Sequence, residues 1–245
     1  AARWLIGSGS RVYASASRGF RPGSLEDMTR TGSISGGVIL ANTSLRPEFI
    51  NTYEAGGDFK LADGLHISPS LYYSLGTDFH YAVNTGQTIR IGNKNRPLMS
   101  MQNVGKVEIM GGEADVNYSP VAGLDLSANY TYTHSKIVEY SVNQQAGNTD
   151  ITGEYLTYTP EHMVNGALTW RNRYLNINIM YRHMSSQYMN SLNLPDDERG
   201  VNNIPALDFV DAKVWRGLGS HLVLSAGATN LFNKRYVDSS GMNSI

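Results

Sequence analysis

Polar and apolar residues alternate along several stretches of the chain. From Leu65 to Phe79 the odd-numbered positions are mostly apolar or aromatic, whereas the even-numbered positions are mostly small, polar or charged. The same alternation recurs over 124–134 and 175–181. Because successive side chains of a strand point to opposite faces, the pattern predicts β-strands with one apolar and one polar face. A soluble sandwich would expose the polar face, whereas an outer-membrane barrel turns the apolar face to lipid and the polar face inward.

The pattern predicts a chain that consists almost entirely of strands. No stretch carries a sustained apolar stripe at helical spacing with helix caps. Several predicted strands exceed the five or six residues usual in globular proteins, and they suit a tilted membrane crossing of about 9–11 residues. The strands are expected near 3–6, 11–20, 49–61, 65–79, 103–118, 124–139, 158–171, 174–188, 207–216 and 220–231.

Short turns and long loops alternate between these strands. We expect short turns at 62–64, 120–123, 172–173 and 217–219, and long loops at about 21–48, 80–102, 140–157 and 189–206. This alternation collects the long loops at one end of the sheet, which is typical of bacterial outer-membrane barrels. Aromatic residues near the strand ends would fit interfacial girdles, although β propensity alone also favours them in strands: Tyr118, Tyr130, Tyr132, Trp170, Tyr181 and Trp215.

Composition narrows the class of protein. The chain has 245 residues, a formal net charge of −1, a mean hydropathy of −0.30 and no cysteine. Its length suffices for one barrel or sandwich, and its near-zero charge does not indicate a nucleic-acid partner. The lack of cysteine excludes disulfides and thiolate metal sites. No apolar run of about 18 residues is present, which excludes a transmembrane helix but leaves a transmembrane barrel open.

Several short motifs resemble a known family. The segment Asn230–Tyr236 is similar to the Asn-Leu-Phe-Asp-Lys-Arg-Tyr segment that precedes the last strand of TonB-dependent outer-membrane receptors. Further matches follow in the family's order: Ser17–Pro22; Asn42–Glu48, with Thr43 in place of the family's first proline; Tyr53–Glu54; and Asn103–Lys106, followed by Gly111 and Glu113. Each motif alone is weakly specific, but together they cover nearly the whole chain in the expected order.

The resemblance implies an all-β, antiparallel transmembrane barrel. Residues 1–245 would form about ten C-terminal strands of a 22-stranded barrel, as a partial barrel domain. The family's N-terminal plug domain, the first half of its barrel and its last strand have no counterpart here. The chain also starts almost inside a strand, and ten strands of a large barrel cannot close alone. We therefore expect one part of a larger receptor, or one piece of a split receptor.

The resemblance also implies a function. Such a receptor lies in the outer membrane of a Gram-negative bacterium, in contact with outer-membrane lipid, and takes up a scarce small-molecule ligand, most often a ferric siderophore. The TonB–ExbB–ExbD complex would energise transport through the missing plug, and a partner subunit or lipoprotein remains open. No cofactor is expected, since the iron chelate would be cargo. Cobalamin, haem or oligosaccharide uptake are alternatives, but the family's haem receptors carry a histidine that residues 23–41 lack.

Two groups of residues are candidates for binding. On the polar face, the resemblance implies that Glu54, Asp58, Glu113 and Asp115 bond to plug arginines, the alternative being solvated charges in the lumen. Flexible methionine and flat tyrosine surfaces at the loop end suit a large, partly apolar ligand, although they would equally pack the loops. These candidates are Tyr81, Met99, Met101, Tyr155, Met184, Tyr188 and Met189.

Metal and catalytic sites are not predicted. Histidines at the rim, such as His80, His162 and His183, are easily solvated, and the run from Asp196 to Glu198 lacks the spacing of a calcium loop. No catalytic order or phosphate-binding loop stands in a suitable context, so we expect no enzyme. Two other classes remain open: a ten-stranded outer-membrane protease or lipase, with Asp78, His80, Asp196 and Asp197 as its best candidates, and a soluble β-rich binding module.

Overall fold

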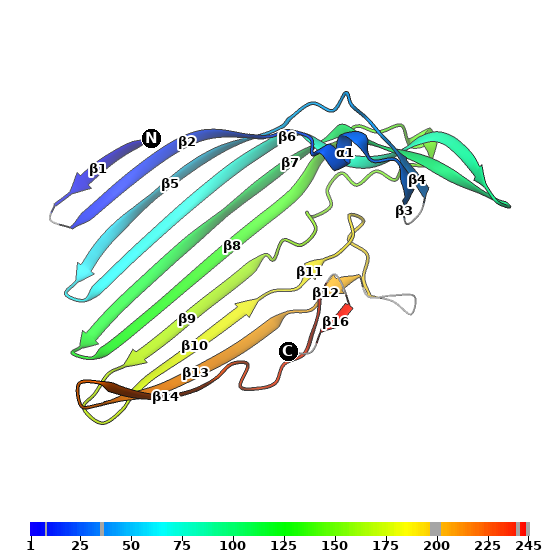
Figure 1. The fold of residues 1–245 in the computed structure, drawn as a ribbon. Coiled ribbons are helices and arrows are strands. Elements are labelled where there is room, and N and C mark those ends of the chain that lie inside the picture. Colours follow the sequence, from blue (N-terminus) through cyan, green and yellow to red (C-terminus); the bar gives the residue numbers. More distant parts are fainter. Residues whose placement is uncertain (8, 35–36, 197–201, 239–240, 244–245) are drawn as a thin grey trace.

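The fold is a curved β-sheet in which long strands follow one another in chain order (Figure 1). The computed structural model describes residues 1–7, 9–34, 37–196, 202–238 and 241–243. Neighbouring strands along the sheet are antiparallel. In spatial order they are β1 (Ala2–Ile6), β2 (Ser10–Arg21), β5 (Glu48–Ala62), β6 (Leu65–Ile91), β7 (Lys94–Val121), β8 (Leu124–Tyr140), β9 (His162–Trp170), β10 (Asn176–Met184), β13 (Leu207–Leu218) and β14 (Leu222–Ala228).

The remaining elements lie in the long connections. They are α1 (Leu25–Thr29), β3 (Gly32–Ile34), β4 (Gly37–Leu40), the 3-10 turn η1 (Gln144–Ala146), β11 (Gln187–Tyr188), β12 (Asn203–Ile204), β15 (Tyr236–Asp238) and β16 (Gly241–Asn243). Strand β4 joins the main sheet by pairing in parallel with β7. Among the described residues, no helix is both long and apolar enough to cross a membrane.

The sorting of connections by length is confirmed. Short turns at 63–64, 122–123, 171–175 and 219–221 join the strands at one end, and the long connections lie at the other (Figure 1). The tightest turns need glycine. Gly64 and Gly123 have φ values of +74° and +83°, and a Cβ at either position would meet a backbone oxygen at 2.5 Å or less. Glycine adopts this left-handed conformation at no steric cost.

The prediction of a long loop at 80–102 is wrong. Strands β6 and β7 continue through it as one paired hairpin, which turns only at Gly92 and Asn93 and projects beyond the other loops (Figure 1). Register shifts between Gly76 and His80, and between Asn84 and Thr88, break the side-chain alternation that would have revealed the strands. A β-bulge of this kind displaces the period-two pattern while the backbone pairing continues.

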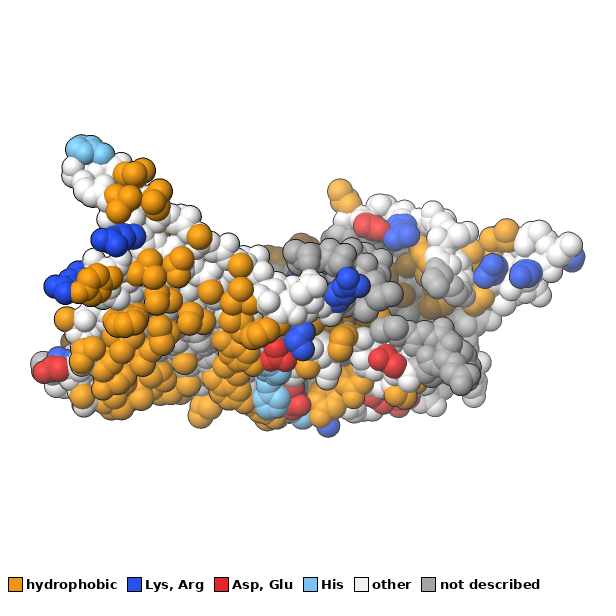
Figure 2. Space-filling model, turned by 90° about the horizontal axis from the view of Figure 1, so that it is seen from below, with side chains coloured by type: hydrophobic (Ala, Val, Ile, Leu, Met, Phe, Trp, Pro, Cys, Tyr) orange, Lys and Arg blue, Asp and Glu red, His pale blue; other side chains and the backbone are white. Residues whose placement is uncertain are grey.

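Strand register confirms the assignment of the two faces. Leu71 is 70% exposed on the apolar face, and the neighbouring Ser70 lies opposite Gly56 and Glu113 on the polar face. Figure 2 shows hydrophobic side chains in a broad band over the strands, with charged and histidine side chains on both sides of it, at the short-turn end and toward the loops. Trp215 departs from the expected girdle, because it pairs with Asn176 and Ser225 on the polar face.

Glycines in the strands allow aromatic rings to lie against the backbone. At Gly111 an added Cβ would meet the carbonyl oxygen of Tyr132 at 2.1 Å and the Tyr72 hydroxyl at 2.5 Å. The Tyr72 hydroxyl lies 2.8 Å from the Thr133 hydroxyl, two strands away. On the opposite face, Gly112 leaves room for the Leu71 side chain. Rings that cover glycine backbone in this way pin the register of neighbouring strands.

Candidate functional site

The four predicted lumen acids all lie on the inner, polar face of the sheet. Asp58 forms an ion pair with Arg11, and the Tyr13 hydroxyl donates to Glu54 over 2.6 Å. Glu113 lies opposite Ser70 and Thr131, and is exposed. These acids therefore form one inward-facing group on β5 and β7, as the alternation predicts.

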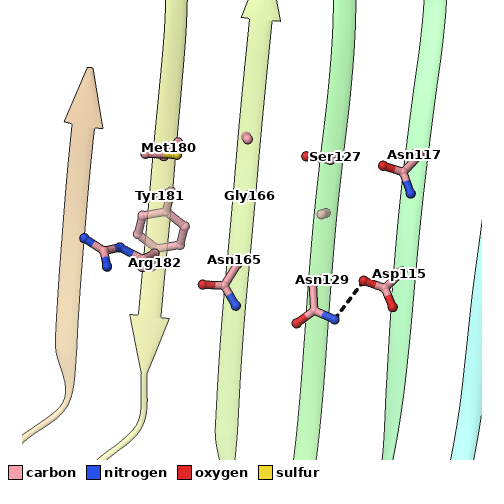
Figure 3. A pocket seen from close by; sticks show the side chains of 11 residues that line it. Asp115, Asn117, Ser127, Asn129, Asn165, Gly166, Met180, Tyr181 and Arg182 are labelled. Atoms are coloured by element: carbon pink, nitrogen blue, oxygen red, sulfur yellow. Dashed lines mark hydrogen bonds between the residues drawn. The ribbon is translucent and has the colours of Figure 1, made fainter. Parts of the chain in front are cut away.

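A shallow polar pocket continues this inner wall across β7 to β10 (Figure 3). It has a volume of about 240 Å³. Asn129 donates to Asp115 over 3.0 Å, and Arg182 donates to Asp211 over 2.9 Å on the neighbouring strand. In Figure 3 Asn165 lies between Asn129 and Arg182. Amides, a carboxylate and a guanidinium on one wall offer both donors and acceptors to a polar group in the lumen.

An ionic cluster with a buried carboxylate, Glu48, at its centre closes the base of the first long loop. Arg21, the last residue of β2, donates hydrogen bonds of 2.6 and 2.8 Å to the two carboxylate oxygens of Glu48, the first residue of β5. Glu48 is 4% exposed. The backbone N–H of His80 donates to the same carboxylate over 2.8 Å. Burial opposes ionisation, but these hydrogen bonds outweigh it and hold the pKa of the Glu48 carboxyl below its ordinary value.

His80 and Arg46 complete what we call the Glu48 cluster: Arg21, Arg46, Glu48, Asp78, His80 and Asn103. Nε2 of His80 donates to the Arg46 carbonyl over 2.8 Å, so in the neutral ring Nδ1 carries the lone pair. That Nδ1 is buried, and its nearest ionic neighbour is Glu48 Oε1 at 3.6 Å. The Arg46 guanidinium reaches Asp78 over 2.5 Å. Asn103 donates to the carbonyls of Arg46 and Asp78, at 2.8 Å each.

The Glu48 cluster assembles residues from separate motifs of the family resemblance. Arg21 comes from the first motif, Arg46 and Glu48 from the second, and Asn103 from the fourth. In the sequence, Arg46 and Glu48 are recognised only as parts of a family motif, and His80 is expected only as a rim residue. The three motifs were the sequence signal for this cluster, because each of them contributes polar residues to it.

Three of the predicted ligand residues lie on the projecting hairpin and beneath the first loop. Met99 of β7 is paired with Ile39 of β4, and the Met101 carbonyl accepts a hydrogen bond from the Asn42 side chain over 2.8 Å. Tyr81 packs against a small hydrophobic core made by Val107, Ile137 and Ile151. Its ring meets that of Tyr140 edge to face at 5.4 Å, and burial raises the pKa of the Tyr81 hydroxyl to about 12.

The other four predicted ligand residues lie on the β8–β9 and β10–β13 connections. Tyr155 and Tyr188 stack with ring centroids 6.0 Å apart. Met184 accepts a hydrogen bond at sulfur from Gln187, over 3.4 Å, and the Met189 N–H donates to the Asn202 carbonyl. The structure thus divides the seven residues into two groups at the same end of the sheet.

The described residues contain no cluster of three or more His, Cys, Asp or Glu side chains suited to a metal ion. Asp196 instead accepts the backbone N–H groups of Asn202 and Asn203, at 2.6 and 2.9 Å. The other two residues of the acidic run, at 197 and 198, lie outside the described residues. Of the proposed enzyme residues, Asp78 and His80 are engaged in the Glu48 cluster.

Comparison with known proteins identifies the family. The family model for the TonB-dependent receptor-like β-barrel matches residues 1–231. An iron-regulated outer membrane virulence protein of Vibrio cholerae serotype O1 is 27% identical over 238 residues, which is 91% of this chain and 33% of that protein. The chain therefore spans about a third of the length of this relative.

Solved structures share the fold at lower identity. The ferric yersiniabactin uptake receptor FyuA from Yersinia pestis aligns with a TM-score of 0.70 and 15% identity, over 98% of this chain and 33% of that one. The ferric enterobactin receptor PfeA from Pseudomonas aeruginosa aligns with a TM-score of 0.73 and 19% identity, over 98% of this chain and 35% of that one. The copper transporter OprC aligns with a TM-score of 0.66 and 19% identity, over 95% of this chain and 32% of that one. The chain belongs to the TonB-dependent receptors of the outer membrane, a family of receptors and transporters and not of enzymes.

Proposed function

We propose that this chain forms part of the barrel wall of a receptor that takes up a ferric siderophore by TonB-dependent active transport. The observation that carries the proposal is the family match over residues 1–231. The name of the Vibrio relative and the titles of two of the structural neighbours support iron as the cargo. The fold alone does not identify iron as the cargo, because a copper transporter shares this fold.

The inner wall supports a role in transport. Glu54, Asp58, Glu113 and Asp115 face the lumen, and in the complete receptor they would bond to a plug domain carried elsewhere in the protein. Arg11 and Asn129 already satisfy part of the hydrogen-bonding capacity of Asp58 and Asp115. Glu113 is exposed on the inner face and is the best candidate for such a bond. TonB and its ExbB–ExbD partners would act through the plug and would not contact this segment.

The loop end supports capture of the ligand. Binding residues concentrate on loops held by a rigid scaffold, and here the Glu48 cluster and the hydrophobic core around Val107 hold the loops. Met99, Met101, Tyr155, Met184, Tyr188 and Met189 would supply adaptable apolar contacts. Tyr81 would act indirectly, by supporting the hairpin from the core.

Growth of a receptor-deletion strain under iron limitation tests the proposal. Single ferric siderophores are supplied, and the complete receptor is returned with and without TonB. We expect growth on at least one siderophore, and only with TonB present. The Tyr155→Ala/Met189→Ala variant should raise the siderophore concentration needed for growth, while Tyr174→Ala at the short-turn end should not. Growth on no siderophore, together with cobalamin- or copper-dependent rescue, would reassign the cargo.

A further inference from the structure

The imidazole ring of His80 is buried beside a carboxylate to which it makes no hydrogen bond. Only 1% of the His80 side chain is exposed, and its Nδ1 lies 3.6 Å from Oε1 of Glu48. Because Nε2 donates to the Arg46 carbonyl, the proton of the neutral ring is on Nε2. Nδ1 therefore holds a buried lone pair that has no hydrogen-bond partner among the described residues. Nothing in the proposed transport uses this nitrogen.

A β-bulge gives the His80 ring this position. The pairing of β6 with β7 shifts register twice just before His80. Within this bulge Asp78 has a φ of +61°, in the left-handed region that a residue with a side chain rarely adopts. Arg46, from the connection 22–47, holds Asp78 through an ion pair. Bulges of this kind re-aim side chains, and here the ring meets Glu48, the first residue of β5.

Charged groups of both signs surround the His80 ring and the carboxylate beside it. The titratable groups that face either of them are Glu48 on β5, Arg21 on β2, Arg46 in the connection 22–47, Asp78 and Tyr81 on β6, and, beside Arg21, Asp27 on α1. From β7 the ring faces the uncharged Asn103.

These surroundings can accommodate a positive charge on His80. Arg21 is paired with Glu48, and Arg46 with Asp78, so neither guanidinium is left uncompensated. Burial and the two guanidinium groups oppose a charge on the ring, whereas the carboxylates favour it. The Glu48 carboxylate is the group that directly faces Nδ1, and a proton there would supply the hydrogen bond that the buried nitrogen lacks.

We propose that His80 is a proton-operated latch, a contact that holds the connection 22–47 more firmly in mild acid. At neutral pH the ring binds the connection through Nε2 alone. A proton on Nδ1 adds a charge-assisted hydrogen bond to Glu48, so the imidazolium ties β6 both to β5 and to the connection. Histidine ordinarily changes its charge between about pH 5 and 8. The order of the first long loop is thereby coupled to the pH at the loop end of the barrel.

The direction of this pH dependence follows from proton counting. The latched state binds one more proton than the released state, so a fall in pH favours the latched state. Glu48 remains the acceptor in mild acid, because the pKa of its carboxyl is held below the ordinary value. Stronger acid protonates Glu48 itself and removes both its pair with Arg21 and the latch. The connection is therefore held most firmly in mild acid.

Hydrogen exchange of the complete receptor, in detergent and without siderophore, tests the latch. Mass spectrometry follows the backbone amides of the connection 22–47 at about pH 7.5 and about pH 5.5, which lie on either side of the ordinary pKa of histidine. The rates are corrected for the intrinsic pH dependence of exchange, so that they report local opening. Heat-modifiable mobility on gels verifies that each variant folds.

Three variants separate the latch from other effects of pH. His80→Gln keeps an amide donor for the Arg46 carbonyl but cannot take up a proton. Glu48→Gln keeps the histidine and removes the charged acceptor. His183→Gln is the matched control, because Nδ1 of His183 lies 2.9 Å from Asp208, a histidine–carboxylate pair outside the Glu48 cluster.

We expect the protection of the connection to rise about fivefold at the lower pH in the wild type and in His183→Gln. It should stay level in His80→Gln and in Glu48→Gln. Equal protection of the wild type at the two pH values overturns the latch, and so does a rise that persists in either cluster variant. Loss of the rise in His183→Gln would also overturn it. Because no siderophore is present, a failure of the cargo assignment would not affect the result.

Discussion

Arg21 and Glu48 lie directly opposite each other on β2 and β5, and the guanidinium holds both carboxylate oxygens. The pair closes the connection 22–47 at its base, where the chain leaves one strand and starts the next. Because His80 and Asn103 bind the same region, the pair also ties this connection to β6 and β7.

Replacing Glu48 with Gln should loosen the connection 22–47 in a pH-dependent way. The pKa of Glu48 is lowered in the folded state, so the ionised carboxylate stabilises the fold fully above its ordinary pKa of 4.5 and loses that effect as pH falls through the folded-state value. We expect a loss of about 1–3 kcal/mol at neutral pH, and a difference from wild type that shrinks under acid. Limited proteolysis of the folded receptor at several pH values measures it.

Glu26→Gln is the matched control for that experiment. Glu26 of α1 forms an exposed ion pair with Arg30, the residue that follows the helix, and exposed pairs of this kind contribute at most about 1 kcal/mol. Equal protease sensitivity in the two variants at neutral pH would contradict the anchoring role of Glu48.

Leu71→Arg should block assembly, whereas Ser70→Arg should be tolerated. Leu71 faces lipid, where an arginine near the midplane costs about 2–4 kcal/mol. Ser70 faces the lumen opposite Glu113, which would pair with the new guanidinium. Heat-modifiable mobility reports assembly, and equal tolerance of both variants would reverse the assignment of faces.

A cysteine at Lys94 should react with an impermeant maleimide in intact cells, and one at Asp63 should not. Lys94 lies at the tip of the projecting hairpin, whereas Asp63 lies in a short turn at the opposite end. Asp63 should react only after the outer membrane is opened. Labelling of Asp63 alone in intact cells would invert the topology.

Gly111→Ala should destabilise the barrel much more than Gly166→Ala. A Cβ at Gly111 would meet the Tyr132 carbonyl oxygen at 2.1 Å, whereas at Gly166 the nearest atom is 3.9 Å away. Overpacking typically costs about 1–3 kcal/mol, and backbone cannot move aside as a flexible side chain can. Unfolding in urea, followed by gel mobility, compares the two variants. Similar midpoints would show that β7 and β8 separate freely at this point.

The sequence alone determined the strands of the membrane-spanning sheet and their two faces. Alternation is a local property of an extended chain, so it was readable at Leu65–Tyr73 and Ile177–Tyr181, and the motifs identified the family. The same reasoning placed all four lumen acids on the correct face, since face depends only on parity along a regular strand.

Only the tertiary structure decided how distant segments meet. The hairpin through 80–102 depends on pairing between β6 and β7 across bulges that shift parity, so no local pattern reveals it. The Glu48 cluster joins residues 32 positions apart in the case of Glu48 and His80. Tyr155 and Tyr188 stack on each other, and Tyr155 also packs on His134, although the three residues lie far apart in the chain. These ring contacts between connections are not encoded in the sequence spacing.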